Sequence, residues 1–345
     1  MSGQPYGAGE LTARRRETSM ADVARVAGVS GQTVSRVANG HSSVRAATRE
    51  KVLAVMRELD YRPNSAARAL RSGRFRSLGV IVFTLSSFGN RRTLESITVA
   101  ATEQRYTVTL MPLTRPTHSD VLAALDRLGE QAVDGVIVLI ESHLLDAVGA
   151  KLPHGIPLVV VDSRVADRLP VVDTDQFQGA RLATEHLLTL GHDTVWHVAG
   201  PADSSSAALR LRGWRETLTA HGRPVPEPLR GDWNADSGHA AGEALAQQPG
   251  VTAVFTANDQ MALGALRALA EAGRRVPRDV SVVGFDDMEE ARNFLPSLTT
   301  VHQDFDVIGR TAVQALLQDI EGGPPVAYTG VAPRLVVRDS TAPPA

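Results

Sequence analysis

Beyond Arg76 the sequence alternates short apolar runs with helical stretches, and this alternation limits the folds that the chain can adopt. The strand-like runs are Leu78–Phe83, Tyr106–Met111, Gly135–Ile140, Leu158–Val161, Thr194–Val198, Ala253–Thr256 and Val280–Val283. The helical stretches between them include Leu94–Thr102, Asp120–Leu128, Gly179–Thr189, Ala207–Thr217, Gly238–Ala246 and Gln260–Glu271. Apolar strands that alternate with helices form parallel sheets covered on both faces. About 270 residues of this pattern predict an α/β body of two doubly wound lobes with a cleft between them.

A different pattern lies upstream, where residues 20–40 (MADVARVAGVSGQTVSRVANG) predict two short helices joined by a turn. The first helix begins after the candidate N-cap Ser19, and its apolar residues recur at helical spacing. Gly28 ends that helix, and Ser30 can cap the second one. A third helix, Ala46–Leu59, completes a small core beneath them. This is a helix-turn-helix, whose second helix enters the DNA major groove.

Side chains near the start of that second helix meet base edges when it lies in the groove. The residues at this place are Gly31, Gln32, Thr33, Ser35 and Arg36. Glutamine can bond adenine through N6 and N7, and arginine can clamp guanine through O6 and N7. The alternative is a generic helical hairpin in which Gln32 and Arg36 contact only water.

The charge distribution separates a basic N-terminal part from an acidic remainder. Residues 1–76 contain 14 Lys and Arg but 6 Asp and Glu, whereas residues 77–345 contain 22 and 32. A small basic part on a large acidic one indicates that only the basic part contacts a polyanion. Residues 1–18 contain three arginines and no periodicity, so we expect a disordered tail that can contact phosphates.

The segment after the third helix is predicted to be a hinge. Pro63 disfavours helix at the residue before it, and Asn64 can cap a short helix over Ser65–Ser72. This stretch is shorter than the ~12–15 residues that an isolated helix needs in water, so we expect it to be disordered alone and helical when docked. Leu70, its one large apolar side chain, suits a wedge between base steps in the minor groove. The alternative is an ordinary linker whose leucine packs on the neighbouring domain.

Composition excludes several classes of protein. The chain has no cysteine, so it forms neither a disulfide framework nor a thiolate metal site. Arg14–Arg16 precede no apolar run, which excludes a signal peptide. No stretch of about 18 apolar residues is present that would span a membrane. We therefore expect a cytoplasmic protein without membrane contact.

The motifs of common enzyme classes are missing from the sequence. No GxGxxG follows a strand, and neither a P-loop nor a GxSxG elbow is present. The ten histidines show no metal-binding spacing, and we expect His186, His192 and His197 to be packed or at the surface. The sequence thus predicts a protein that is not an enzyme and needs no cofactor or metal.

Polar residues end several of the predicted strands. Asp162, Asn258 and Asp286 each follow an apolar run, and open parallel sheets bind ligands at the carboxyl ends of their strands. Arg210 adds a planar donor fork and Trp233 an apolar face, a combination that suits a sugar ring. Taken singly, such an Asp or Asn is often a helix cap, and a Trp is usually part of a core.

These motifs together resemble the lac repressor (LacI) family of bacterial transcription regulators, over residues 18–343. In the N-terminal part the resemblance rests on DVA at 22–24, AGVS at 27–30, TVSRV at 33–37, TREKV at 48–52, Tyr61, Pro63 and Asn64. In the body it rests on AGP at 199–201, RLRGW at 210–214, GDW at 231–233, ANDQMA at 257–262, VVGFDD at 282–287 and LTT at 298–300. The resemblance implies a dimer whose heads read a pseudo-palindromic operator. It also implies a periplasmic-binding-protein-like body of two lobes crossed by three strands.

The resemblance further implies two sets of functional residues. Positions that bind an effector between the lobes are matched by Asp162, Ser206, Arg210, Trp233, Asn258, Asp286, Gln303 and Phe305. Base-reading positions are matched by Gln32 and Arg36, and the minor-groove wedge by Leu70. Positions that hold the DNA backbone or place the head are matched by Thr33, Ser35, Asn39 and Tyr61, and the expected DNA-binding set also includes Ser30, Gly31, Asn64 and Ala67.

Three features depart from the family pattern. Gly31 stands where the member that names the family has a base-contacting tyrosine, so the operator sequence does not follow from the resemblance. Residues 86–93, SSFGNRRT, replace an apolar wall of the pocket in the N-lobe, so the identity of the sugar does not follow either. The sequence ends at Ala345 without a leucine heptad tail, so we expect a homodimer and not a tetramer.

The expected domains are a tail (1–18), a helix-turn-helix head (19–62), a hinge helix with its linker (63–75) and an effector-binding and dimerisation body (76–340). Within the body the N-lobe takes about 76–174 and 303–332, and the C-lobe about 175–302 and 333–340. The predicted function is a repressor released from its operator by a galactoside or other glycoside. The alternatives are a family member activated by a corepressor and a soluble sugar-binding protein without a regulatory role.

Overall fold

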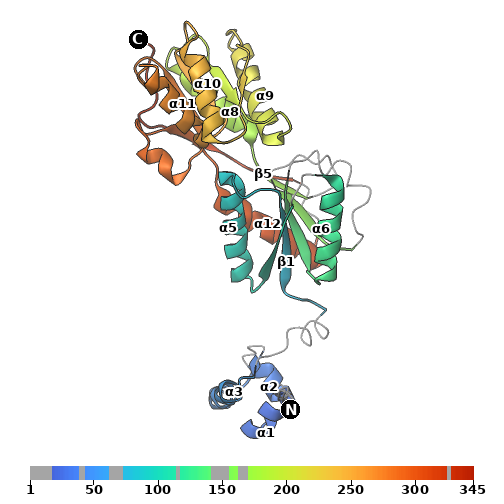
Figure 1. The fold of residues 1–345 in the computed structure, drawn as a ribbon. Helices are drawn as coiled ribbons and strands as arrows, with labels where there is room; N and C mark the ends of the chain where they lie inside the picture. The colour runs from blue at the N-terminus through green and yellow to red at the C-terminus, as the bar shows by residue number, and fades with distance from the viewer. Residues whose placement is uncertain are drawn as a thin grey trace, which may run out of the picture. The chain divides into compact units, whose positions relative to one another are not determined.

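The chain separates into two compact units, Met1–Phe75 and Arg76–Ala345 (Figure 1). The computed structural model describes residues 18–38, 43–61, 73–113, 117–140, 155–161, 170–324 and 328–345. In these described parts, none of the helices combines the length and the apolar character needed to cross a bilayer.

The N-terminal unit contains three helices, α1 (Met20–Ala27), α2 (Gly31–Ala38) and α3 (Ala46–Glu58). Ser19 caps α1 through a capping box with Asp22, and these hydrogen bonds hold the pKa of Asp22 well below its usual range. Gly28 ends α1 at φ 63°, a left-handed conformation that glycine adopts without strain. The predicted helix-turn-helix and third helix are confirmed. Their inward residues form one core, which includes Val23, Ala27, Val34, Val37, Val52, Val55 and Met56.

The second unit contains two six-stranded sheets. The first sheet has the order β11-β5-β4-β3-β1-β2 with parallel pairing throughout. Its strands are β1 (Ser77–Val82), β2 (Thr107–Pro112), β3 (Gly135–Leu139), β4 (Leu158–Val161), β5 (Val171–Thr174) and β11 (Tyr328–Val331). We call the lobe built on this sheet the N-lobe.

The second sheet has the order β12-β10-β9-β8-β6-β7 and defines the C-lobe. Its strands are β6 (Trp196–Ala199), β7 (Leu229–Arg230), β8 (Ala253–Thr256), β9 (Ser281–Asp286), β10 (Thr299–His302) and β12 (Arg334–Val336). All pairs are parallel except β10 with β12. The chain therefore passes between the sheets after β5, after β10 and after β11.

Helices cover both faces of each sheet (Figure 1). In the N-lobe, α5 (Phe88–Glu103) and α12 (Phe305–Ile320) pack on one face of the sheet and α6 (His118–Glu130) on the other. In the C-lobe the two faces carry different pairs of helices, α8 with α9 and α10 with α11. Their bounds are α8 (Gln176–Thr189), α9 (Ser205–Ala220), α10 (Ala235–Ala246) and α11 (Asp259–Glu271). A 3-10 turn, η1 (Glu289–Asn293), follows β9.

Strand β1 shows why the sequence folds this way. Leu78, Val80 and Val82 pack toward α5 and α12, whereas Ile81 packs toward α6. A strand buried on both faces is a near-continuous apolar run, which is the pattern that predicted the sheet. All seven predicted strands are present, with ends shifted by no more than a few residues.

Candidate functional site

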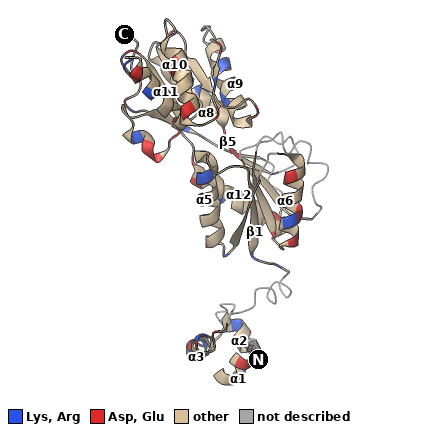
Figure 2. Cartoon of the chain, viewed as in Figure 1, with Lys and Arg blue, Asp and Glu red and all other residues tan. Residues whose placement is uncertain are grey.

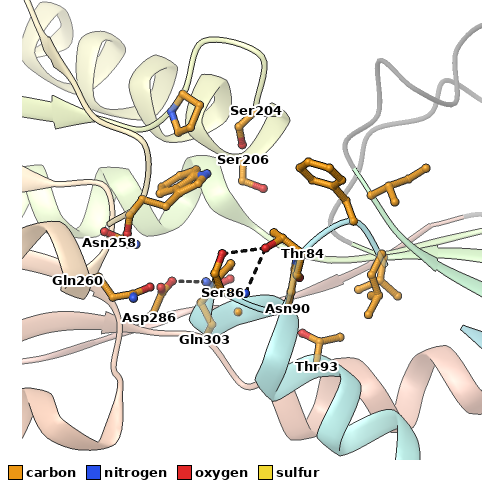
Figure 3. Close-up of a pocket in the computed structure, with 18 of the residues that line it drawn as sticks. Thr84, Ser86, Asn90, Thr93, Ser204, Ser206, Asn258, Gln260, Asp286 and Gln303 are labelled. Atoms are coloured by element: carbon orange, nitrogen blue, oxygen red, sulfur yellow. Dashed lines mark hydrogen bonds between the residues drawn. The ribbon is translucent and has the colours of Figure 1, made fainter. Parts of the chain in front are cut away.

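A cavity of about 830 Å³ lies between the two lobes of the second unit (Figure 3). Both lobes contribute to its wall, and the chain crossings at the ends of β5 and β10 run beside it. The volume lies in the upper part of the range of about 300–1,000 Å³ that is typical of small-molecule sites. The predicted cleft between the lobes is therefore present.

The structure brings most of the sequence-derived effector residues together on the wall of this cavity. They are Ser206, Arg210, Trp233, Asn258, Asp286, Gln303 and Phe305. Asp162, the remaining residue of that set, lies outside the described residues. The rule that parallel strands end at one edge accounts for this convergence at Asn258 and Asp286, which follow or end β8 and β9.

A buried ion pair forms the polar centre of the wall. Arg210 on α9 lies 3.7 Å from Asp286 at the end of β9, with side-chain exposures of 5% and 8%. Gln303 donates from Nε2 to Asp286 Oδ1 at 2.7 Å, and Arg210 also donates to the carbonyl of Ala257. Two charges held out of water are costly unless hydrogen bonds satisfy them. The wall therefore presents fixed acceptors and donors in a low-dielectric site.

Two residues that the sequence analysis did not single out complete this network. Gln176, the first residue of α8, accepts from Arg210 Nε at 2.8 Å and donates to Gln303 Oε1 at 3.1 Å. It also donates to Asp173 Oδ1 at 3.2 Å, and Asp173 lines the cavity from β5. The network thus joins residues beside two of the chain crossings, so that a ligand bound here contacts the segments that connect the lobes.

A hydrogen bond connects the side chain of Asn258 to the backbone of Trp233. Asn258 caps α11 by accepting from the amide of Met261 at 2.8 Å, and its Nδ2 donates to the Trp233 carbonyl at 2.9 Å. Trp233 has a positive φ of 76°, which that bond stabilises. Its indole lies against Gly200, where an added Cβ would be 2.6 Å from Cζ2. Asn258 is therefore both a helix cap and a part of the cavity wall.

The two carboxylates next to this site have structural roles. Asp259 is fully buried and accepts from Thr300 Oγ1 at 2.5 Å and from the amide of Met288 at 2.8 Å. Burial, and secondly the charge of Asp286, raises the pKa of Asp259 well above its usual value.

Asp287 is held by an ion pair with Arg338, whose Nη2 lies 2.5 Å from Oδ1, and by His302 at 2.9 Å. Burial raises the pKa of Asp287, but hydrogen bonds from His302 and Arg338 outweigh this effect and leave the pKa lowered. These pairs tie β9 and β10 to the segment that follows β12.

The N-lobe wall has both polar and apolar parts. Thr84, Ser86, Asn90 and Thr93 supply hydroxyl and amide groups, from the loop after β1 and the first turns of α5 (Figure 3). Apolar side chains of the same wall are Phe83, Leu113, Leu139, Ile140, Val161 and Ile308. The departure from an apolar wall that the sequence indicated at residues 86–93 therefore lies on the cavity itself.

In the N-terminal unit, α2 carries the base-reading candidates, Gln32 near its start and Arg36 in its last turn. Ser30 caps α2, because its side-chain oxygen accepts a hydrogen bond from the Thr33 amide at 3.2 Å. Gly31, Gln32 and Arg36 are exposed, Thr33 and Tyr61 are half-buried and Ser35 is buried at 8% exposure. The candidates Asn39, Asn64, Ala67 and Leu70 lie outside the described residues.

Acidic and basic residues are interspersed along the described helices of the body, whereas α2 carries a basic residue and no acidic one (Figure 2). A helix-turn-helix unit followed in the chain by a two-lobed body with a polar cavity defines the class of ligand-responsive transcription regulators. Two family models match the chain: "Bacterial regulatory proteins, lacI family" over residues 19–64, and "Periplasmic binding protein-like domain" over residues 184–341. The chain belongs to the lacI family of bacterial transcription regulators and is not an enzyme.

Curated relatives and solved structures agree with this assignment. The chain is 39% identical to the lactose operon repressor of Escherichia coli (strain K12), over 89% of this chain and 86% of that protein. It is 37% identical to the transcriptional regulator CelR of Thermobifida fusca, over 90% of this chain and 94% of that protein. It is 33% identical to the transcriptional repressor PurR of Haemophilus influenzae (strain PittEE), over 92% and 97%.

Among solved structures, the lac repressor dimer bound to operator and the anti-inducer ONPF matches with a TM-score of 0.86 at 37% identity. That match covers 95% of this chain and 100% of the other. A complex of the transcriptional regulator CelR with cellobiose matches with a TM-score of 0.68 at 33% identity, covering 94% and 100%.

Proposed function

We propose that this chain is a homodimeric transcriptional repressor that binds a pseudo-palindromic operator through α2 and is released by a sugar bound between the lobes. Gln32 and Arg36 read bases, Thr33, Ser35, Asn39 and Tyr61 hold the backbone or place the head, and Ser30 and Gly31 belong to the same DNA-binding set. Asn64, Ala67 and Leu70 contact DNA from the hinge. The exposed start of α2 and the operator complex of the similar lac repressor support the DNA-binding part.

The observation that carries the sugar assignment is the buried Arg210–Asp286 pair beside the Trp233 indole. The Arg210 guanidinium lies 5.4 Å from the centre of that indole ring. Asp286 accepts from sugar hydroxyls, Arg210 donates to them, and the indole packs against the apolar face of the ring. Solved relatives include the lac repressor bound to ONPG and CelR bound to cellobiose. Asp162, Ser206, Asn258, Gln303 and Phe305 complete the proposed site.

Binding between the lobes couples to DNA because the cavity network reaches the chain crossings. A sugar that favours one angle between the lobes changes the spacing of the two hinge segments of the dimer, Ser65–Ser72 in each chain. These residues lie outside the described part of the chain, and the sequence predicts that they need docking to form a helix, which separation would remove. Effector and operator then weaken each other's binding by the same factor.

The test is a titration of the full-length protein with a glycoside panel in the presence of labelled duplex DNA. A target duplex is first selected from a random library, and its affinity is measured by fluorescence anisotropy. The expected result is a sugar that binds the free protein and lowers its affinity for the duplex. No preference for any duplex over random competitor, with or without sugar, contradicts the proposal. A sugar that instead raises DNA affinity identifies a corepressor-activated regulator.

A further inference from the structure

The N-lobe wall of the cavity carries a row of polar groups that is held in place before any ligand arrives. The Oγ atoms of Thr84 and Ser86 lie 2.7 Å apart, and the Ser86 amide donates to Thr84 Oγ1 at 3.1 Å. Asn90 donates from Nδ2 to the Thr84 carbonyl at 3.0 Å, which fixes its side chain beside Ser86 (Figure 3). Groups held by such a local network lose little freedom when a ligand binds.

Thr93 extends this row and has no partner within it. Its side chain lines the cavity at 5% exposure, and its hydroxyl makes no hydrogen bond to any residue that the structure describes. On the C-lobe side, Gln260 also lines the cavity, and its buried Oε1 has no hydrogen-bond partner among the described residues. A buried polar group without a partner is costly, so Gln260 Oε1 is expected to accept a hydrogen bond from an occupant, and the Thr93 hydroxyl on the cavity wall can bond to one as well.

The same wall has an apolar part beside the polar row. Phe83, Leu113, Leu139, Ile140 and Val161 supply it. A pyranose ring has C–H faces that pack on apolar side chains and a rim of hydroxyls that bond to polar ones. An apolar aglycone would cover the apolar part but form no hydrogen bond to Ser86, Asn90 or Thr93, and covering polar groups that then lose water without gaining a new partner disfavours such a ligand.

The size of the cavity agrees with an occupant larger than one ring. One ring on the Arg210–Asp286 pair accounts for the C-lobe wall, yet the space of about 830 Å³ continues to the N-lobe wall. Ligands that fill volumes of this order are drug-sized, and a single pyranose is well below that size.

We propose that the effector is a disaccharide or longer glycan whose second ring is recognised by Ser86, Asn90 and Thr93 of the N-lobe. This inference rests on the proposed function and names the ligand class of the same site. The first ring lies against Trp233 and bonds to Arg210 and Asp286. The second ring bonds to the N-lobe row through its hydroxyls, so the sugar spans both lobes.

The experiment measures binding to the full-length protein by isothermal titration calorimetry. The probes are matched pairs: cellobiose with methyl β-D-glucopyranoside, lactose with methyl β-D-galactopyranoside, and o-nitrophenyl β-D-galactopyranoside as a ligand with an apolar aglycone. The expected result is that, in at least one pair, the disaccharide binds at least about tenfold more tightly than its methyl glycoside. Loss of two or more hydrogen bonds of ordinary strength gives a factor of this order.

The substitution Thr93→Val removes one hydroxyl and keeps the side-chain shape. We expect it to weaken disaccharide binding about 3–10-fold and to leave binding of the methyl glycoside unchanged. Thr98→Val is the matched control, because Thr98 lies exposed on the same helix and its hydroxyl donates to the Leu94 carbonyl at 2.8 Å, within the helix. It is expected to change neither affinity, and thermal melts check that both variants are folded.

Three results overturn the inference. They are equal binding of a disaccharide and its methyl glycoside, equal weakening of both by Thr93→Val, or tighter binding of the o-nitrophenyl glycoside than of every disaccharide. Each of these leaves the proposed function intact as long as a sugar still changes DNA affinity. If none of the probes binds, the two-ring effector is also rejected. If sugars bind without any effect on DNA, the proposed function fails while the two-ring site is judged by the same affinity ratios.

Discussion

The Arg210 guanidinium lies 3.7 Å from the Asp286 carboxylate, and each side chain is more than nine-tenths buried. The Arg210 guanidinium also lies 3.7 Å from the centre of the Phe285 ring, so its position is fixed on a second side. Water around two such charges is largely replaced by fixed protein groups. The pair therefore stabilises the fold only while both partners are present.

The first prediction concerns removal of the cationic partner. Arg210→Met removes the cationic partner of the buried Asp286 carboxylate, to which Gln303 still donates a hydrogen bond. We expect the free energy of unfolding to fall by about 3 kcal/mol and sugar binding to be lost. Urea unfolding of the full-length protein, followed by far-UV circular dichroism, measures the first effect.

The double variant Arg210→Met with Asp286→Asn is the control. It removes both charges, so we expect it to be more stable than Arg210→Met alone. If the double variant is the less stable of the two, the ion pair does not account for the loss.

A second prediction uses the contact between Gly200 and Trp233. A methyl group at residue 200 would lie 2.6 Å and 2.7 Å from indole carbons Cζ2 and Cζ3, so Gly200→Ala must displace the ring. We expect about tenfold weaker sugar binding with unchanged affinity for the selected duplex in the absence of sugar. Calorimetry and anisotropy measure the two quantities separately.

Trp233→Ala provides the matching background for that variant. It should itself weaken sugar binding, and Gly200→Ala added to it should cost nothing further, because no ring remains to be displaced. An additional loss in the double variant would show that residue 200 acts through another contact.

The sequence predicted strands that are mostly apolar runs, including the edge strand β2, and missed short or partly polar strands, including the internal strands β5 and β10. Strands β1, β3, β4, β8 and β9 are apolar runs buried on both faces. Their apolar composition alone is enough to predict that they are buried strands. Five strands were not predicted: β5, β7, β10, β11 and β12. They are short or partly polar, and pairing with neighbouring strands determines them more than their own residues do.

The candidate site shows the same division. Strand-end residues such as Asn258 and Asp286 are predictable, because the carboxyl ends of parallel strands all lie at the same edge of the sheet. Gln176 is not, since its importance comes from hydrogen bonds to Arg210 and to Gln303, which is 127 residues away. Thr93 could not be singled out from the sequence either, because its role depends on its position in the cavity wall.

A third prediction concerns pH. Burial lowers the pKa of His197 to about 3, since the ring lies in the C-lobe core and is stacked on Phe255 at 4.7 Å between centroids. Its pKa in the unfolded chain is about 6.5, so below that pH the unfolded state binds a proton that the folded state does not. Stability from this group is complete above pH 6.5 and declines as pH falls toward 3.

The expected loss between pH 7 and pH 5 is about 2 kcal/mol of unfolding free energy from His197. His197→Phe should remove this part of the pH slope, although it also lowers stability at pH 7 by removing the hydrogen bond to the Phe255 carbonyl. His118→Gln, a change at an exposed histidine, should keep the slope. Urea unfolding at several pH values measures it, and equal slopes for His197→Phe and the unchanged protein would contradict the assignment.

The last prediction concerns DNA recognition by α2. Arg36 is exposed in the last turn of this helix, and as a base contact it should contribute sequence preference rather than general affinity. We expect Arg36→Ala to cost about 1–3 kcal/mol of binding to the selected duplex and to relax preference at one base pair. Arg57→Ala, an exposed change on α3, serves as the control and should alter affinity little. Competition against single-base variants of the duplex measures the preference. A loss of the same size on every duplex, together with a shallower salt dependence, would instead place Arg36 at a phosphate.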